Sequence, residues 1–233
     1  MKMVIITGTS ASGKTSLMYH VIKELKEEGI ETAVCKIDCL KTRDDKKYAE
    51  LGVPVAVGLS DYICPDHYYV SNLEEIFNWA KKLKVKVLVI ETAGLCNRCA
   101  PAVEGCLNIC VLDNLSGVDM PGKVGPLLTT ADVAVITKGD IVSQAEREVF
   151  RYRLSKVNPE AEILNANGLT GQGATKLKNI ILSWEDIEEV EGRKLKSSMP
   201  ASVCSYCTGE QLIGSKYQMG NVRKGIVWGT GHD

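Results

Sequence analysis

The sequence predicts an α/β fold in which a mainly parallel sheet is covered by helices on both faces. Short apolar runs that resemble buried strands alternate with segments of helical periodicity, and this order is typical of a parallel sheet with helical crossovers. The first apolar run leads into a glycine-rich loop at residues 8–15, and a helical pattern follows the loop. With 233 residues, the chain is long enough for one sizeable α/β domain or for a domain with an appendage.

The first half of the chain divides into elements by apolar spacing and by the residues that end helices. Leu17, Val21 and Leu25 recur at helical spacing, and Gly29 ends that helix. We expect strands or apolar strand-like runs at residues 3–7, 32–37, 53–59 and 84–90, and helices at residues 14–28 and 41–51. Residues 60–67 are rich in turn formers, and Ser71 or Asn72 can cap a helix that continues to about Leu83.

The second half repeats the alternation. We expect strands at residues 107–112, 131–137 and 162–165, and helices at residues 143–157 and 174–184. From about Gly192 the pattern changes to a segment rich in Gly, Ser and Lys. We therefore predict a main domain at residues 1–191 and a small cysteine-containing C-terminal appendage at residues 192–233.

The loop after the first strand contains Gly-x-x-x-x-Gly-Lys-Thr, from Gly8 to Thr15. Gly8 and Gly13 let the backbone wrap closely around phosphate oxygens, while backbone N–H groups and the positive end of the next helix face the anion. Lys14 supplies a charge to the outer phosphates, and the Thr15 hydroxyl is a ligand for Mg²⁺. The strand–loop–helix context makes this a strong P-loop match, which predicts a P-loop NTPase. The residues expected to contact the nucleotide here are Gly8, Ser10, Ala11, Ser12, Gly13, Lys14, Thr15 and Ser16.

A second nucleotide motif, Thr137-Lys138-Gly139-Asp140, ends a predicted strand and resembles the Asn-Lys-x-Asp base-recognition motif of GTPases. The Asp140 carboxylate can accept from both N1–H and the 2-amino group of guanine, a pair that adenine does not offer. The Lys138 stem can lie over the base, and Asn165 is assigned to the same site. Thr137 replaces the usual Asn, which leaves open how this loop is tethered.

Acidic residues end two further predicted strands. Glu91 can reach Mg²⁺ or its water, and Gly94, three residues later, can follow the γ-phosphate. Asp38 can also bear on Mg²⁺, although acidic residues often end strands without a function. The candidate catalytic residues are therefore Lys14, Glu91 and Asp38.

Together these residues resemble the nickel-chaperone GTPases, namely the urease accessory GTPase and the hydrogenase nickel-incorporation GTPase. The resemblance covers roughly residues 1–187 and includes the loop at residues 121–126, the segments at residues 158–163 and 170–173, and Cys64-Pro65-Asp66-His67. It implies a nucleotide-dependent homodimer that hydrolyses GTP with Mg²⁺ and helps mature a metalloenzyme. It also implies that Cys64 and His67 bind Ni²⁺ or Zn²⁺ between two subunits, with Asp66 as an insertion into the family motif.

The chain has nine cysteines, including two Cys-x-x-Cys pairs. The pairs Cys96/Cys99 and Cys204/Cys207 can supply four thiolates, sufficient for Zn²⁺ or an iron–sulfur cluster, and a thiol–disulfide role is the alternative. Cys110 fits a core position, Cys106 is ambiguous, and Cys35 and Cys39 fit structural roles.

The formal net charge of −1 gives no indication of nucleic-acid binding, and no apolar run approaches the length of a membrane span. The first strand and P-loop leave no room for a signal peptide, so we expect a cytoplasmic protein. The leading interpretation is a GTP-hydrolysing metallochaperone whose partners are a second copy and a client metalloenzyme or its accessory proteins. The alternatives are a small-molecule P-loop kinase and a metal- or redox-sensing nucleotide-binding module.

Overall fold

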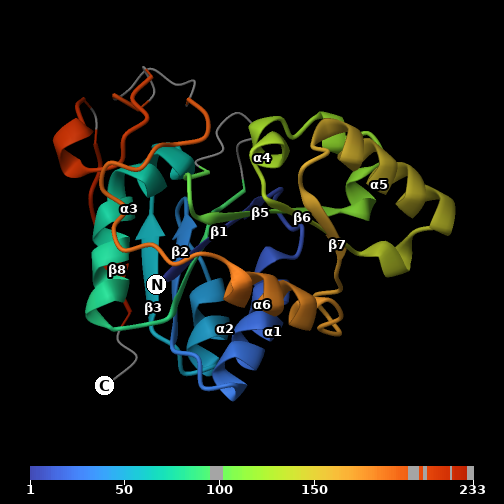
Figure 1. Cartoon of the computed structure of the whole chain (residues 1–233), viewed down its shortest axis with the longest axis horizontal. Coiled ribbons are helices and arrows are strands. Elements are labelled where there is room, and N and C mark those ends of the chain that lie inside the picture. Colours follow the sequence, from blue (N-terminus) through green and yellow to red (C-terminus); the bar gives the residue numbers. More distant parts are fainter. Residues whose placement is uncertain (95–101, 199–204, 207–208, 221, 230–233) are drawn as a thin grey trace.

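The computed structural model describes residues 1–94, 102–198, 205–206, 209–220 and 222–229. In these residues an eight-stranded sheet has the order β7-β6-β5-β1-β4-β2-β3-β8 (Figure 1). The strands from β7 to β3 pair in parallel, and β8 pairs antiparallel with β3. The strands are β1 (Lys2–Gly8), β2 (Thr32–Asp38), β3 (Val55–Leu59), β4 (Val87–Glu91), β5 (Leu107–Asp113), β6 (Val133–Thr137), β7 (Glu162–Asn165) and β8 (Ile226–Trp228). The predicted α/β fold with a mainly parallel sheet is confirmed.

Helices cover both faces of this sheet (Figure 1). One face carries α1 (Lys14–Glu27), α2 (Asp44–Glu50) and α6 (Ala174–Ser183). The other face carries α3 (Pro65–Lys82), α4 (Pro126–Thr129) and α5 (Gln144–Val157). Short 3₁₀ turns are η1 (Asn114–Ser116), η2 (Met120–Gly122), η3 (Gly139–Ile141) and η5 (Ser215–Tyr217).

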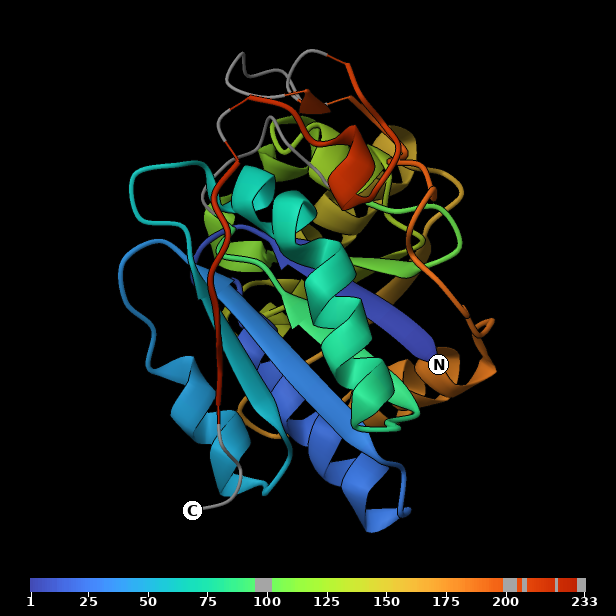
Figure 2. The same ribbon diagram turned by 90° about the vertical axis from the view of Figure 1, so that its left-hand side faces the viewer.

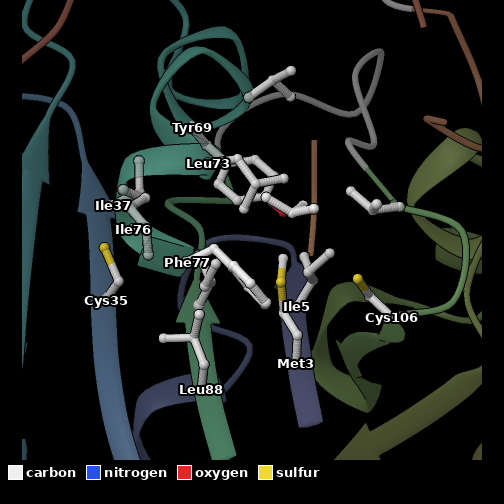
Figure 3. Packing of buried hydrophobic residues seen from close by; sticks show 14 of the residues in the cluster. Met3, Ile5, Cys35, Ile37, Tyr69, Leu73, Ile76, Phe77, Leu88 and Cys106 are labelled. Atoms are coloured by element: carbon white, nitrogen blue, oxygen red, sulfur yellow. The ribbon is translucent and has the colours of Figure 1, made fainter. Parts of the chain in front are cut away.

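The central strand β1 shows why the sheet is buried on both faces. Its side chains alternate, so Met3 and Ile5 point toward α3 while Val4 and Ile6 point toward α1. Figure 3 shows side chains of α3 packed against Met3 and Ile5. Each fully buried aliphatic side chain of this kind contributes about 1.5–3 kcal/mol. The packing fixes the carboxyl end of β1, from which the P-loop departs.

Helix α3 begins at Pro65, with Cys64 as its N-cap, so the prediction of a start at Ser71 or Asn72 was wrong. A proline at the first helical position has a suitable φ and no N–H to leave unbonded, and Asp66 adds an acid to the first turn. The Ser71 hydroxyl instead donates to a backbone carbonyl one turn earlier, at 2.9 Å. Part of the predicted turn is therefore helical.

The C-terminal segment packs along α3 and extends the main sheet (Figure 2). The Asn72 amide donates to the carbonyl of Arg223 at 2.9 Å, and the guanidinium of Arg223 pairs with Asp61 at 3.0 Å. Trp228 of β8 stacks on Trp79, with ring centroids 5.4 Å apart. Part of the predicted appendage thus lies against the main domain, and the boundary at residue 192 stays a prediction. Among the helices of the described ranges, none combines the length and apolar character that a bilayer span requires.

Candidate functional site

The loop between β1 and α1 surrounds a cavity of about 320 Å³. Gly8 has φ +138°, and a Cβ there would lie 2.1 Å from the Val111 carbonyl oxygen, so this turn requires glycine. Of the predicted nucleotide and catalytic residues, the cavity is lined by Ser10, Ala11, Ser12, Gly13, Lys14, Thr15, Ser16, Asp38 and Glu91. It is also lined by Lys36, Asp44, Lys47 and Ala93, which the sequence analysis did not select.

Lys14 lies within the loop that it belongs to. Its side chain is buried, and its ammonium donates to the carbonyl oxygens of Gly8 and Thr9 at 3.1 and 2.9 Å. Burial lowers the pKa of Lys14 to about 8, and the Glu91 carboxylate opposes that change. A phosphate entering the cavity would therefore replace backbone carbonyls as the partner of this ammonium.

Thr15 and two carboxylates form the oxygen-rich wall of the cavity. The Thr15 hydroxyl lies 2.6 Å from Oε1 of Glu91 and 3.1 Å from Oδ2 of Asp44. A hydroxyl and carboxylates are hard oxygen donors of the kind that Mg²⁺ prefers. The donor set therefore fits Mg²⁺, with Asp44 as a member that the sequence analysis missed.

Two buried side chains complete the surroundings of Glu91. Lys36 donates to Oε1 of Glu91 at 2.6 Å and lies 3.2 Å from Oδ2 of Asp44. Tyr48 donates to Oε2 of Glu91 at 2.5 Å. Burial lowers the pKa of Lys36, but Glu91 and Asp44 outweigh burial and raise that pKa above its ordinary value. The signal available in the sequence was a lysine among the apolar side chains of the middle of β2, between Ala33 and Ile37.

A second cavity, of about 290 Å³, lies at the carboxyl ends of β6 and β7. It brings together Asp140 and Asn165, both predicted to bind the nucleotide, although they are 25 residues apart in sequence. The other lining residues are Ile136, Gly139, Gln144, Arg147, Glu148, Arg151, Ala166, Asn167 and Gln172. The Asp140 carboxylate can accept hydrogen bonds from a planar ring that carries N–H donors, and a cavity of this size has room for such a ring.

The two cavities are connected by hydrogen bonds between β6 and the P-loop. The Thr137 hydroxyl donates to the Ser12 carbonyl at 2.6 Å, and the Lys138 ammonium donates to the Ala11 carbonyl at 2.8 Å. The Asn114 amide donates to the Thr137 carbonyl at 3.1 Å. Threonine at the position where the usual motif has asparagine therefore does tether this loop.

Gly94 lies directly against the P-loop. Its φ is +74°, and a Cβ there would lie 2.0 Å from the Gly8 carbonyl oxygen and 2.6 Å from the Lys14 ammonium. Any larger residue would displace one of these groups. The contact places Gly94 beside Lys14, and its role beside the outer phosphates stays a prediction.

Of the cysteine and histidine side chains predicted to bind a metal, the structure describes Cys64 and His67. Cys64 is half-buried at the start of α3, and His67 is 1% exposed within its first turn. Across the part of the chain that the structure describes, no three His, Cys, Asp or Glu side chains gather as a metal site. Cys96, Cys99, Cys204 and Cys207 lie outside the described residues. All of these metal ligands stay predictions.

The other cysteines lie on or beside the strands. Cys35, Cys106 and Cys110 are buried, and burial raises the pKa of the Cys106 and Cys110 thiols to about 12. These thiols are therefore protonated at neutral pH. Cys39 is partly exposed, and burial also raises the pKa of its thiol. The core position expected for Cys110 agrees with this burial, which also resolves Cys106 as a buried thiol.

The chain is similar to several known proteins. A model of the CobW/HypB/UreG nucleotide-binding domain matches residues 2–165. An uncharacterized protein of Methanocaldococcus jannaschii is 50% identical over 224 residues, which is 96% of this chain and 96% of that protein. The urease accessory protein UreG of Trichodesmium erythraeum is 28% identical over 195 residues, covering 76% of this chain and 89% of UreG. The structure of HypB from Helicobacter pylori in complex with nickel has a TM-score of 0.66 at 21% identity, covering 81% of this chain and 91% of that one.

Proposed function

Because the chain belongs to the CobW/HypB/UreG family of nucleotide-binding domains, we propose that it is a GTPase that acts as a metallochaperone. In this proposal GTP hydrolysis is coupled to the delivery of a metal to a client metalloenzyme. One relative is a urease accessory protein, and one structural neighbour was crystallised in complex with nickel, which favours nickel as the cargo. Zinc and an iron–sulfur centre remain the alternatives that thiolate ligands permit.

The observation that carries the GTPase proposal is the connection between the two cavities. Asp140 stands at a cavity large enough for a purine base, and Thr137 joins that loop to the P-loop through the Ser12 carbonyl. A nucleotide with its phosphates on the P-loop would then reach Asp140 with its base. The carboxylate accepts the two donors of guanine, so GTP is favoured over ATP.

In this proposal the side chains of the P-loop cavity bind Mg²⁺ and the phosphates. Thr15 would hold Mg²⁺ through its hydroxyl, with Glu91 and Asp44 beside it. The bound ion would supply positive charge at the phosphates. Lys14 would leave the Gly8 and Thr9 carbonyls to donate to phosphate oxygens as charge develops during the attack of water.

The chain also suggests how nucleotide state would reach the metal. Gly94 contacts the P-loop, and Cys96 and Cys99 follow it within five residues.

In the shared site implied by family resemblance, Cys64 and His67 of one chain supply two ligands, and a second copy would supply two more. The number of ligands would then suit a tetrahedral or square-planar metal. By linkage, a metal that binds more tightly with GTP must raise GTP affinity by the same factor.

The test measures affinity and multiple-turnover phosphate release with GTP, ATP and xanthosine triphosphate. We expect a preference for GTP, and Asp140→Asn should weaken GTP by about a hundredfold, or about 2.7 kcal/mol, while improving binding of the xanthosine nucleotide. Lys14→Ala should stop turnover while the protein stays folded. Equal affinity for ATP and GTP would contradict the guanine assignment, and a phosphorylated small molecule would identify a kinase. Elemental analysis and an absorption spectrum of anaerobically purified protein identify the metal.

A further inference from the structure

The ammonium of Lys36 contacts the same oxygen atoms that would surround Mg²⁺. Its Nζ lies 2.6 Å from Oε1 of Glu91 and 3.2 Å from Oδ2 of Asp44. The Thr15 hydroxyl contacts these same two carboxylate oxygens, at 2.6 and 3.1 Å. Lys36 therefore places a fixed positive charge beside the hydroxyl that would bind a divalent cation.

The sheet fixes Lys36 in this position. β2 and β4 are neighbouring parallel strands, and Lys36 is the register partner of Glu91. The Lys36 side chain is only 5% exposed and that of Glu91 only 1% exposed, so neither charge is well screened by water. Lys36 forms ion pairs with both carboxylates, and removing one partner from such a buried pair costs free energy.

We propose that Lys36 is a positioning residue that makes divalent-cation binding depend on the nucleotide. Its ammonium competes with Mg²⁺ for Glu91 and Asp44, so the protein alone holds Mg²⁺ weakly. A nucleotide adds phosphate charge and phosphate oxygens, and the ion then binds despite Lys36. This inference rests on the proposed nucleotide function, because it assigns the ion to the same site.

The charges around the cavity support this competition. The Lys14 and Lys36 ammonium groups lie close enough for each to affect the other, and Glu91 faces both. Three ammonium groups and three carboxylates line the cavity and balance each other, so a divalent ion that enters alone meets little net attraction; these groups belong to Lys14, Lys36, Lys47, Asp38, Asp44 and Glu91. Removing the charge of Lys36 leaves an excess negative charge, which should attract the ion.

The chain offers a matched control for this charge. Lys47 also lies near Asp44, with Nζ 3.9 Å from Oδ1, but its side chain is 54% exposed. Lys47→Met removes a screened surface charge next to the same carboxylate. Lys36→Gln removes the buried charge and keeps an N–H donor for Glu91, and Lys36→Met removes both.

The experiment titrates each protein with Mn²⁺, a paramagnetic substitute for Mg²⁺, and measures free Mn²⁺ by electron paramagnetic resonance. Without nucleotide, we expect Lys36→Gln to bind Mn²⁺ at least about tenfold more tightly than the unmodified protein, and Lys47→Met to change affinity less than about threefold. With GDP bound, the advantage of Lys36→Gln should shrink to less than about threefold, because phosphate charge then dominates.

Equal or weaker Mn²⁺ binding by Lys36→Gln in the absence of nucleotide would overturn the inference. Thermal unfolding of each variant shows whether the fold is retained. If Lys36→Met fails to fold, Lys36→Gln decides the question, and Lys36→Arg, which keeps the charge, should bind Mn²⁺ like the unmodified protein. Failure of the unmodified protein to bind GDP or GTP would refute the proposed function instead, so the two failures are distinguishable.

Discussion

Thr137 provides a sharp test of how base recognition is connected to the P-loop. Its side chain is 1% exposed, and its hydroxyl donates to the Ser12 carbonyl at 2.6 Å, while the Leu112 carbonyl lies farther away at 3.3 Å. A hydroxyl has one proton to donate, so the shorter contact takes it. Thr137→Val has nearly the same shape but removes this donor.

The expected cost follows from the burial of the bond. Leaving the Ser12 carbonyl without this donor should lower the free energy of unfolding by about 1–3 kcal/mol. For a chain of 233 residues, that corresponds to a fall in Tm of about 2–12 °C. The loop that carries Asp140 loses one of its attachments to the P-loop and keeps the hydrogen bond from Lys138 to the Ala11 carbonyl, so GTP affinity should also fall, by about tenfold.

Thr137→Ser separates these two effects. It keeps the hydroxyl but loses a methyl group that lies close to Gly13, so it should cost about 1 kcal/mol of stability and leave GTP affinity unchanged. Urea unfolding and equilibrium GTP binding are measured on both variants. If the two variants bind GTP equally well, the hydroxyl does not couple the two loops and the reasoning is wrong.

Further predictions concern the phosphate loop, the metal and the thiols. Gly94→Ala should reduce GTP affinity by more than about tenfold, because its Cβ would meet the Gly8 carbonyl and the Lys14 ammonium, and unchanged binding in a titration would contradict the close contact. Cys64→Ala should remove a metal that binds at one equivalent per two chains and promotes dimerisation with GTP; one full equivalent per monomer, measured by light scattering with metal analysis, would reject the shared site. Iodoacetamide at pH 8 should leave the buried thiols of Cys35, Cys106 and Cys110 unmodified in the folded protein, because buried thiols with a raised pKa form little thiolate. Mass spectrometry measures the modification, and urea-unfolded protein is the control.

Sequence signals within a few residues were sufficient to predict helices whose ends are fixed by neighbouring side chains. The helix expected at residues 143–157 begins as α5 after Ser143, whose side chain accepts from the N–H of Glu146 in a capping box. The start of α3 was missed because Cys64 to His67 resembles a turn, although proline before an acidic residue is also a signal for a helix start. One sequence pattern therefore permitted both structures, and packing of α3 against the sheet favours the helix.

The candidate site was predictable where its motifs are contiguous. The P-loop, Glu91 and Asp140 all lie at the edges of cavities, as expected from strands that end together. Lys36 was not predictable, because its role depends on β2 being the neighbour of β4, and strand order is not written in the local sequence. Tyr48 resembles an ordinary core residue until its contact with Glu91 is known.

The antiparallel pairing of β8 with β3 has a practical consequence for shortening the chain. A fragment ending at residue 191 would keep the P-loop and the loop of Asp140, but it would expose the backbone donors and acceptors along the outer edge of β3. It would also remove Trp228 from Trp79 and leave the Asn72 amide without the Arg223 carbonyl. An open strand edge beside a bared aromatic ring is a template for aggregation. β8 therefore protects the protein from aggregation, although no β8 residue is among the residues that line the two cavities.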